Sequence, residues 1–280
     1  MPSGGCLYIV PTPIGNLADI STRALQTLAQ VDLIAAEDTR HSARLLSHYQ
    51  ISTRTISLHA HNEKQRSITL VDKLKEGQNI ALISDAGTPL ISDPGYELVN
   101  ICRNEGVKVI ALPGPSALVT ALSASGLPTD KFTFCGFLAH KSQAKSQQLV
   151  AAAALAHTCV FYESPRRISD TVALCQSILP QHTRYVLAKE LTKTFETYVS
   201  GGTDALLAYL SADPGHLKGE FVLLIYCEKL QLDALPQEAL QLLDELLPLL
   251  PPKQAAAVVA KHYSLNKKQL YQHSLTVGRE

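Results

Sequence analysis

The chain has 280 residues, which suggests about two domains, and its 25 Lys and Arg balance 25 Asp and Glu to a net charge of zero. Hydrophobic residues make up 46% of it, which excludes a disordered chain, and the neutral balance argues against nucleic-acid binding through bulk charge. The sequence shows scattered cysteines without a CxxC pair, no membrane-length apolar run and no signal-peptide pattern at the N-terminus. We therefore expect free thiols and a cytoplasmic location.

Residues 1–120 alternate short apolar runs with amphipathic stretches. Continuous apolar runs separated by helix-length segments are typical of a parallel sheet that helices cover on both faces. The predicted strands are Cys6–Val10, Val31–Ala36, Thr55–Leu58, Asn79–Ser84 and Val107–Leu112. Helix starts are expected at Asn62, Asp93-Pro94 and Ser164-Pro165, where a capping side chain precedes the first turn.

A second α/β segment is predicted from about Leu127 to Leu230. Two of its strands, near residues 185 and 199, are too close in sequence for a helical crossover, so this sheet is expected to be mixed. The predicted strands are Phe132–Phe137, Cys159–Glu163, Tyr185–Leu191, Glu196–Val199 and Glu220–Cys227.

The composition changes after residue 230. Residues 231–250 hold four acids and no Lys or Arg, whereas residues 251–280 hold five bases and one acid. The pattern predicts three helices without a strand. Two of them, Lys253–Tyr263 and Asn266–Ser274, are joined around Ser264-Leu265, which is consistent with a helix-turn-helix. The predicted domains are residues 1–121, 122–230 and 235–280.

The loops that leave the first five strands are the expected ligand site, because open parallel sheets bind ligands beyond the carboxyl ends of their strands. The phosphate-binding fingerprints GxxxxGK[ST] and GxGxxG are absent, and Pro11 and Pro13 lack N–H groups. Asp85, Gly87 and Thr88 could instead receive an ammonium, a ribose or a sulfonium cofactor such as S-adenosylmethionine. The alternative is an ordinary strand-to-helix turn in which Asp85 bonds to its own loop.

Eight stretches of the chain together resemble the ribosomal RNA small subunit methyltransferase I family, within the tetrapyrrole methylase fold. They are Leu7–Leu17, Ala36–His41, Ser84–Pro89, Ser92–Gly95, Leu112–Ser116, Phe161–Ser164, Glu190–Lys193 and Lys218–Glu220. The resemblance covers essentially the whole chain. It implies two α/β domains with S-adenosylmethionine between them, a small C-terminal helical domain and a homodimer. It also implies 2′-O-methylation of a cytidine, cytidine 1402, in the decoding region of 16S rRNA in the small ribosomal subunit.

The resemblance also implies which residues meet the cofactor. They are Thr12, Pro13, Asp85, Gly87, Thr88, Ser116, Ala117, Tyr162, Gly219 and Glu220.

A general base would help to remove the proton of the ribose hydroxyl. The candidate carboxylates are Glu190, Glu163, Asp38 and Glu37. For each the alternative is a structural ion pair or a helix cap, and Asp38 before Thr39-Arg40 fits a cap well.

Basic side chains near these motifs could bind RNA phosphates or restrain a carboxylate. The candidates for RNA contact are Arg40, Arg166, Arg167, Lys193, Lys267 and Lys268. Four histidines between residues 41 and 61, with their basic neighbours, indicate either an RNA-facing surface or an ordinary solvated face. His59 and His61 lack a third ligand nearby, so no metal site is expected.

Three functions stay open for such a chain. It could be an S-adenosylmethionine-dependent rRNA methyltransferase, a non-catalytic ribosome-binding factor, or a methyltransferase acting on a tetrapyrrole. The intact set of cleft loops favours an enzyme, and the basic C-terminal helices argue against a tetrapyrrole substrate. For these helices we hypothesise that they hold the ribosomal substrate; the alternative is a dimer-packing or lid pair.

Overall fold

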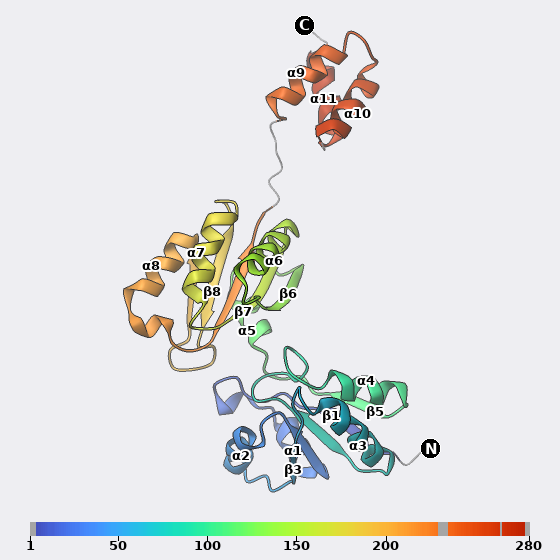
Figure 1. The fold of residues 1–280 in the computed structure, drawn as a ribbon, viewed down its shortest axis with the longest axis vertical. Helices are drawn as coiled ribbons and strands as arrows, with labels where there is room; N and C mark the ends of the chain where they lie inside the picture. Colours follow the sequence, from blue (N-terminus) through green and yellow to red (C-terminus); the bar gives the residue numbers. More distant parts are fainter. Residues whose placement is uncertain (1–3, 229–234, 264, 278–280) are drawn as a thin grey trace. The chain divides into compact units, whose positions relative to one another are not determined.

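The computed structural model describes residues 4–228, 235–263 and 265–277. The chain divides into two compact units, residues 1–228 and residues 229–280 (Figure 1). Among the described residues, no helix is long and apolar enough to cross a membrane.

The first sheet is parallel and has the strand order β3-β2-β4-β1-β5. Its strands are β1 (Cys6–Ile9), β2 (Leu33–Ala36), β3 (Thr55–Ser57), β4 (Ile80–Ile83) and β5 (Lys108–Ala111), which confirms the five predicted runs. From the central strands β1 and β4 the chain moves in opposite directions across the sheet, from β1 to β2 and from β4 to β5. The loops after these two strands therefore diverge at a topological switch point, where sheets of this kind bind ligands.

Helices cover both faces of the first sheet, as predicted. Successive residues of a strand point to opposite faces, and in β2 Leu33 and Ala35 join one core whereas Ile34 and Ala36 join the other. Residues of α3 (Glu63–Lys75) and α4 (Tyr96–Asn104) complete the first core. Residues of α1 (Thr22–Gln30) and α2 (Thr39–His48) complete the second. The central strands β1, β2 and β4 are buried on both sides, which explains their unbroken apolar runs.

The second sheet is mixed, as the sequence predicted, with the order β6-β7-β10-β8-β9. Its strands are β6 (Phe132–Phe137), β7 (Thr158–Glu163), β8 (Arg184–Lys189), β9 (Thr197–Gly201) and β10 (Phe221–Tyr226). Only β6 and β7 are parallel among the pairs of this sheet in the described chain.

The helices of this part lie on both faces of the second sheet (Figure 1). One core packs against α6 (Ser142–Ala154), α7 (Ile168–Ile178) and α8 (Thr203–Ala212), and the other against α5 (Ala117–Ala124). Two short 3-10 helices, η1 (Leu17–Asp19) and η2 (Pro214–Leu217), complete the first unit.

Two helices begin later than the sequence predicted. Helix α4 begins at Tyr96, after Gly95, because Gly95 has φ of 130° and ends the turn that follows Asp93-Pro94. Helix α7 begins at Ile168, because the Ser164 carbonyl accepts from the N–H groups of Arg167 and Ile168 and closes a separate turn first. Helix α3 begins at Glu63 as predicted, but the side chain of Asn62 accepts from the His59 N–H and does not cap the helix.

The second unit contains α9 (Gln237–Leu246), α10 (Pro252–Tyr263) and α11 (Lys267–Val277). They share a small core with Leu243, Ala256, Val259 and Leu270 fully buried, so the predicted helix pair is confirmed. Ser264, in the predicted turn, lies outside the described residues, as does the stretch 229–234. The domain boundaries at residues 121, 230 and 235 stay predictions; the first of them falls inside α5.

Candidate functional site

A cavity of about 430 Å³ lies in the first unit, within the size range of small-molecule sites. One wall consists of the loops after β1, β2 and β4 and the first residues of α5. The other consists of residues at the ends of β6, β7, β8 and β10. The cavity is lined, among other residues, by Ile14, Glu37, Asp85, Gly87, Thr88, Asp93, Ser116, Ala117, Tyr162, Glu163, Glu220 and Val222.

Three carboxylates in this cavity have no cationic partner. Glu37, Asp85 and Asp93 line it, and within the described chain they form no salt bridge and no Lys, Arg or His side chain lines the same space. Burial raises the pKa of Glu37, and the neighbouring charge of Asp93 adds to the rise. Burial likewise raises the pKa of Asp93. The cavity therefore concentrates negative charge that a cationic ligand would neutralise.

The rest of the lining is suited to an apolar ring and a sugar. Ile14, Ala117 and Val222 supply apolar surface, and Tyr162 stands in edge contact with Phe134 and Phe137. An apolar wall with a few convergent polar groups is the usual composition of a cofactor pocket. The carboxylates of this cavity suit the sulfonium, the ammonium and the ribose hydroxyls of S-adenosylmethionine, and its apolar wall suits the adenine.

Short contacts fix the loop at Asp85. The N–H of Thr12 donates to the Gly87 carbonyl, and the Gly87 N–H donates to the Thr12 carbonyl, both at 2.9 Å. Gly87 has φ of 82°, and a side chain there would press against Ile14. The Thr88 hydroxyl donates to the Pro115 carbonyl at 2.9 Å. These bonds fix the backbone of the loop, and the Asp38 N–H, which donates to Asp85 Oδ1 at 3.1 Å, holds the Asp85 carboxylate.

Seven of the ten cofactor residues that the family resemblance implies line the cavity: Asp85, Gly87, Thr88, Ser116, Ala117, Tyr162 and Glu220. Thr12 and Pro13 line a neighbouring smaller cavity instead, and the buried Thr12 hydroxyl donates to the Ser84 carbonyl. Gly219 is not among the lining residues; its φ is 97°, and a Cβ there would overlap the Glu190 carboxylate. Gly219 thus allows β10 to approach Glu190.

Sequence reasoning about the cofactor missed the lining residues Ile14, Asp93, Phe137 and Val222. The side chains of Ile14, Phe137 and Val222 carry no polar signal, and only the meeting of the two sheets brings them together. Asp93 carries a signal, since it follows the Asp85 loop closely, but its place before Pro94 predicts a helix cap.

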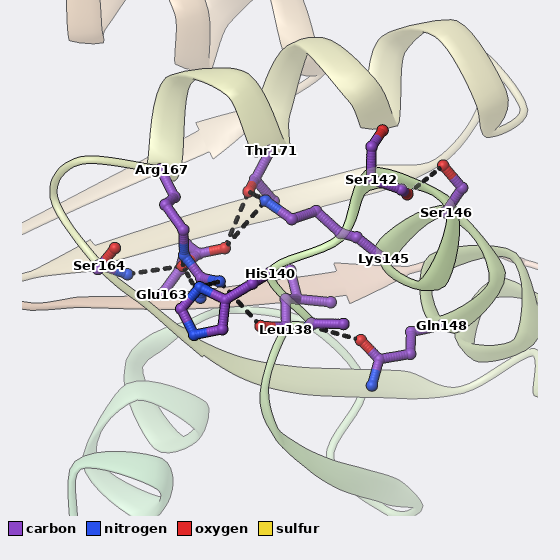
Figure 2. A network of polar contacts seen from close by, with 11 residues as sticks. Leu138, His140, Ser142, Lys145, Ser146, Gln148, Glu163, Ser164, Arg167 and Thr171 are labelled. Atoms are coloured by element: carbon purple, nitrogen blue, oxygen red, sulfur yellow. Dashed lines mark hydrogen bonds and ion pairs between the residues drawn. The ribbon is translucent and has the colours of Figure 1, made fainter.

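The candidate base Glu163 lies in a dense polar network (Figure 2). Its side chain is fully buried and accepts from Arg167 Nε at 2.8 Å, the Thr171 hydroxyl at 2.9 Å and the Ser164 N–H at 2.8 Å. Lys145 Nζ is 3.7 Å from its second oxygen. Arg167 also donates to the Leu138 carbonyl at 3.1 Å. This geometry favours the structural alternative for both Glu163 and Arg167, because their polar atoms are already engaged.

The candidate base Glu190 is also engaged. Its Oε1 accepts from Lys193 Nζ at 2.9 Å and from the Glu220 N–H at 3.0 Å. Burial opposes ionisation, but these two donors hold the pKa of Glu190 below its ordinary value. Lys193 also bonds to the Glu220 carboxylate at 3.1 Å, so this lysine joins Glu190 to Glu220, which lines the cavity.

Asp38 caps helix α2, which is the structural alternative to its role as a general base. Its Oδ1 accepts from the Arg40 N–H at 2.9 Å, and its Oδ2 pairs with the Arg40 guanidinium at 3.0 Å. The hydrogen bonds from Arg40 lower the pKa of Asp38 to about 2. The side chains of Arg40 and Arg166 are exposed, as are those of Lys267 and Lys268 in the second unit. Contact of these basic residues with RNA stays a prediction.

The variant Glu37→Gln is expected to stabilise the fold at neutral pH but not in acid. A carboxyl group whose pKa is raised on folding binds its proton more tightly in the folded state. Stability therefore falls as pH rises from the ordinary value of 4.5 through the raised value. A glutamine side chain does not titrate, so the variant lacks this loss of stability with rising pH. Its side-chain oxygen can still accept a hydrogen bond from the Asp85 N–H. Urea unfolding below pH 4.5 and near neutrality measures it; a stability difference between variant and wild type that does not change with pH would contradict the burial of this charge.

Comparison with known proteins places this site in a family. Residues 6–207 match the model of the tetrapyrrole (corrin/porphyrin) methylases, and residues 233–277 match that of the RsmI C-terminal HTH domain. The chain is similar to solved tetrapyrrole methylase structures. With uroporphyrin-III-C-methyltransferase from Thermus thermophilus the TM-score is 0.54 at 18% identity, covering 80% of this chain and 94% of that one. With a diphthine synthase the TM-score is 0.61 at 15% identity, covering 79% and 90%.

Curated relatives are much closer in sequence. The protein named ribosomal RNA small subunit methyltransferase I from Vibrio cholerae is 53% identical, over 98% of this chain and 96% of its own. Its counterpart from Escherichia coli O157:H7 is 51% identical over the same shares, and that from Pseudomonas aeruginosa is 44% identical over 98% of both chains. The chain therefore belongs to the ribosomal RNA small subunit methyltransferase I family of tetrapyrrole methylases.

Proposed function

We propose that this chain is an rRNA methyltransferase that uses S-adenosylmethionine to methylate the ribose 2′-hydroxyl of a cytidine in the decoding region of 16S rRNA. The observation that carries the cofactor is the cavity with three unpaired carboxylates and no lining cation among the described residues. When bound, S-adenosylmethionine supplies a methyl group on a positively charged sulfur. Asp85 and its neighbours would hold the positive charges, and the apolar wall would hold the adenine.

The rRNA substrate is supported by the names of the curated relatives, which match over nearly the whole chain. It is also supported by the helical second unit. The model of the corrin and porphyrin methylases matches residues 6–207 and does not include this unit, whereas the RsmI C-terminal HTH model matches residues 233–277. The proposal includes that the protein acts on the small ribosomal subunit and that it does so as a homodimer.

The ribose hydroxyl is a weak acid, and a carboxylate near the cofactor would take its proton. Glu37 suits this role better than Glu190, Glu163 or Asp38. It lines the cavity, it has no cationic partner within the described residues, and burial raises the pKa of its carboxyl group toward the working pH. The other three already accept hydrogen bonds from Lys193, Arg167 or Arg40.

The proposal is tested on small ribosomal subunits from cells that lack the protein. Purified protein with labelled S-adenosylmethionine should place the label on one ribose. The phosphodiester after that ribose should resist alkali, because the 2′-hydroxyl is the internal nucleophile of alkaline cleavage. Label on a base, label only on a tetrapyrrole precursor, or binding to the subunit without methyl transfer would each contradict the proposal.

The double variant Lys267→Glu with Lys268→Glu is expected to weaken binding to the small subunit and to flatten its salt dependence. Both side chains are exposed at the start of α11, and each phosphate contact contributes about one to the slope of log affinity against log salt. Affinity for S-adenosylmethionine should not change. Filter binding at several salt concentrations measures this, with Lys253→Glu with Lys261→Glu on α10 as a charge-matched comparison. Equal loss in both double variants would mean a general charge effect.

A further inference from the structure

Two apolar side chains stay exposed where they line the proposed cofactor cavity. Phe137, the last residue of β6, is 57% exposed, and Ile91, in the loop between β4 and α4, is 39% exposed. Other apolar residues of the same lining, such as Ile14 and Val222, are buried. Phe137 and Ile91 therefore lie at the opening of the cavity. Single exposed apolar residues are common, but two that border one cavity form a patch where a ligand can dock.

A β-bulge turns Phe137 toward the cavity. The pairing of β6 with β7 shifts register between Phe134 and Gly136, so Cys135 is one residue more than the partner strand has. Without the extra residue Phe137 would point to the face opposite Phe134, because side chains alternate along a strand. With it, both rings contact Tyr162 edge-on, at centroid distances of 4.9 Å for Phe134 and 5.5 Å for Phe137. Bulges beside active sites re-aim side chains in this way.

The loop that carries Ile91 has an uncommon backbone conformation. Leu90 and Ser92, on either side of it, have φ of 73° and 72°, in the left-handed region that residues other than glycine seldom adopt. Such strain concentrates at binding and catalytic sites, where the surrounding structure maintains it. The Ser92 hydroxyl lies 3.9 Å from the place that a Cβ on Gly136 would take, so this loop meets the bulge of β6. The loop and the bulge thus form one apolar lip, which consists of Ile91 and Phe137.

The apolar lip is chemically suited to the flat face of a nucleobase. Proteins that recognise single-stranded RNA stack its unpaired bases on exposed aromatic side chains. A phosphate is a poor occupant of this opening, because Glu37, Asp85 and Asp93 line the cavity and no Lys, Arg or His of the described chain does. The buried apolar wall suits the adenine of the cofactor, which leaves the exposed lip for a second ligand.

We propose that the base of the methylated nucleotide stacks on Phe137 and packs against Ile91. Both side chains border the cavity, so a base held on them brings its own ribose to the space that would hold the methyl donor. Stacking tolerates every base, because each has a flat π face. The apolar lip therefore positions the nucleotide and does not select cytidine. This assignment deepens the proposed function and rests on it.

The first test measures methyl transfer to small ribosomal subunits from cells that lack the protein. Phe137→Ala should lower kcat/KM for the subunit by about 5- to 150-fold, the effect of losing one stacked base. Phe137→Tyr should keep most of the activity because it keeps the ring, whereas Phe137→Leu should not, because it is apolar without a flat face. Ile91→Ala should lower kcat/KM less, because it removes aliphatic surface only. Affinity for S-adenosylmethionine should not change in these variants.

The second test uses fluorescence, because the chain contains no tryptophan. In Phe137→Trp the introduced indole is the protein's only one, and its emission is the difference from the same mixture made with wild type. Small subunits should quench this emission, since a base stacked on an indole quenches it, and S-adenosylmethionine alone should not. The matched control is Phe132→Trp, which should show no quenching. Phe132 begins the same strand and is 43% exposed, but it does not line the cavity.

Phe132→Ala is the control for the kinetic test and should leave kcat/KM unchanged. Wild-type kcat/KM in Phe137→Ala overturns the role of the apolar lip and leaves the methylation proposal standing. An equal fall in cofactor affinity assigns the ring to the adenine, and a change from dimer to monomer in gel filtration assigns it to a subunit interface; either result overturns the lip. If the wild type methylates no ribose, the proposed function fails, and quenching of Phe137→Trp by small subunits then decides about the lip alone.

Discussion

Replacing Asp85 by asparagine is expected to lower the affinity for S-adenosylmethionine by about 10- to 100-fold, since hydrogen bonds to charged groups contribute about 1.5–3 kcal/mol. Asp85 lines the cavity, and its Oδ1 accepts from the Asp38 N–H at 3.1 Å. Asparagine keeps an oxygen for that bond and removes only the charge. The loop should therefore keep its structure while the cavity loses part of its attraction for a cation. Calorimetric titration of the folded variant with the cofactor measures the change.

A matched control is Asp32→Asn. Asp32 also accepts from a backbone N–H, that of Asn79 at 2.7 Å. It directly precedes β2, so it lies at the amino ends of the strands, whereas Asp85 follows β4 at their carboxyl ends. Its loss of charge should leave cofactor affinity unchanged. Gly87→Val should lower the affinity for the cofactor at least as much as Asp85→Asn does, because the valine adds backbone strain at φ of 82° and its side chain contacts Ile14. Full affinity in Asp85→Asn would remove this carboxylate from the cofactor site.

Replacing Glu163 by glutamine is expected to cost about 3–5 kcal/mol of the free energy of unfolding, the usual effect of breaking a buried ion pair. The Glu163 side chain is fully buried. Two cations face it (Figure 2): Lys145, which is almost fully buried, and Arg167, which is largely buried. Glutamine leaves these two cations without a counter-charge. The network joins α6, α7 and the end of β7, so its loss should loosen the second sheet. Urea unfolding measures the change.

Glu105→Gln supplies the comparison for this variant. It removes the exposed ion pair with Lys75, whose atoms are 2.9 Å apart, and exposed pairs contribute little to stability because water screens them. If Glu163→Gln unfolds as readily as Glu105→Gln, the network is not structural. If Glu163→Gln keeps its stability and loses turnover, Glu163 returns as a candidate base.

The fold could be predicted closely because its signals are local. Parallel strands buried on both faces need unbroken apolar runs, and all ten predicted strands are present. The short spacing between residues 185 and 199 excluded a helical crossover, and β8 and β9 are indeed antiparallel neighbours. The Asp85 loop lines the cavity at the carboxyl edge of the first sheet, where side chains of distant segments meet; its role in binding a ligand stays a prediction.

The roles of the acidic residues could not be predicted in the same way. In the sequence Glu37, Glu163 and Glu190 all lie at strand ends, and each has a basic residue three or four positions further on, so the sequence does not show which of them is paired. The tertiary structure places Lys145 and Arg167 against Glu163 and Lys193 against Glu190, and it leaves Glu37 in the cavity without a cation among the described residues. The sequence by itself determined the layers of the fold and the edge that carries the site. Only the tertiary structure decided which charges are paired: it turns Arg167 and Lys193 back onto the nearby Glu163 and Glu190, and it brings Lys145 to Glu163 and Glu220 to Lys193 from distant parts of the chain.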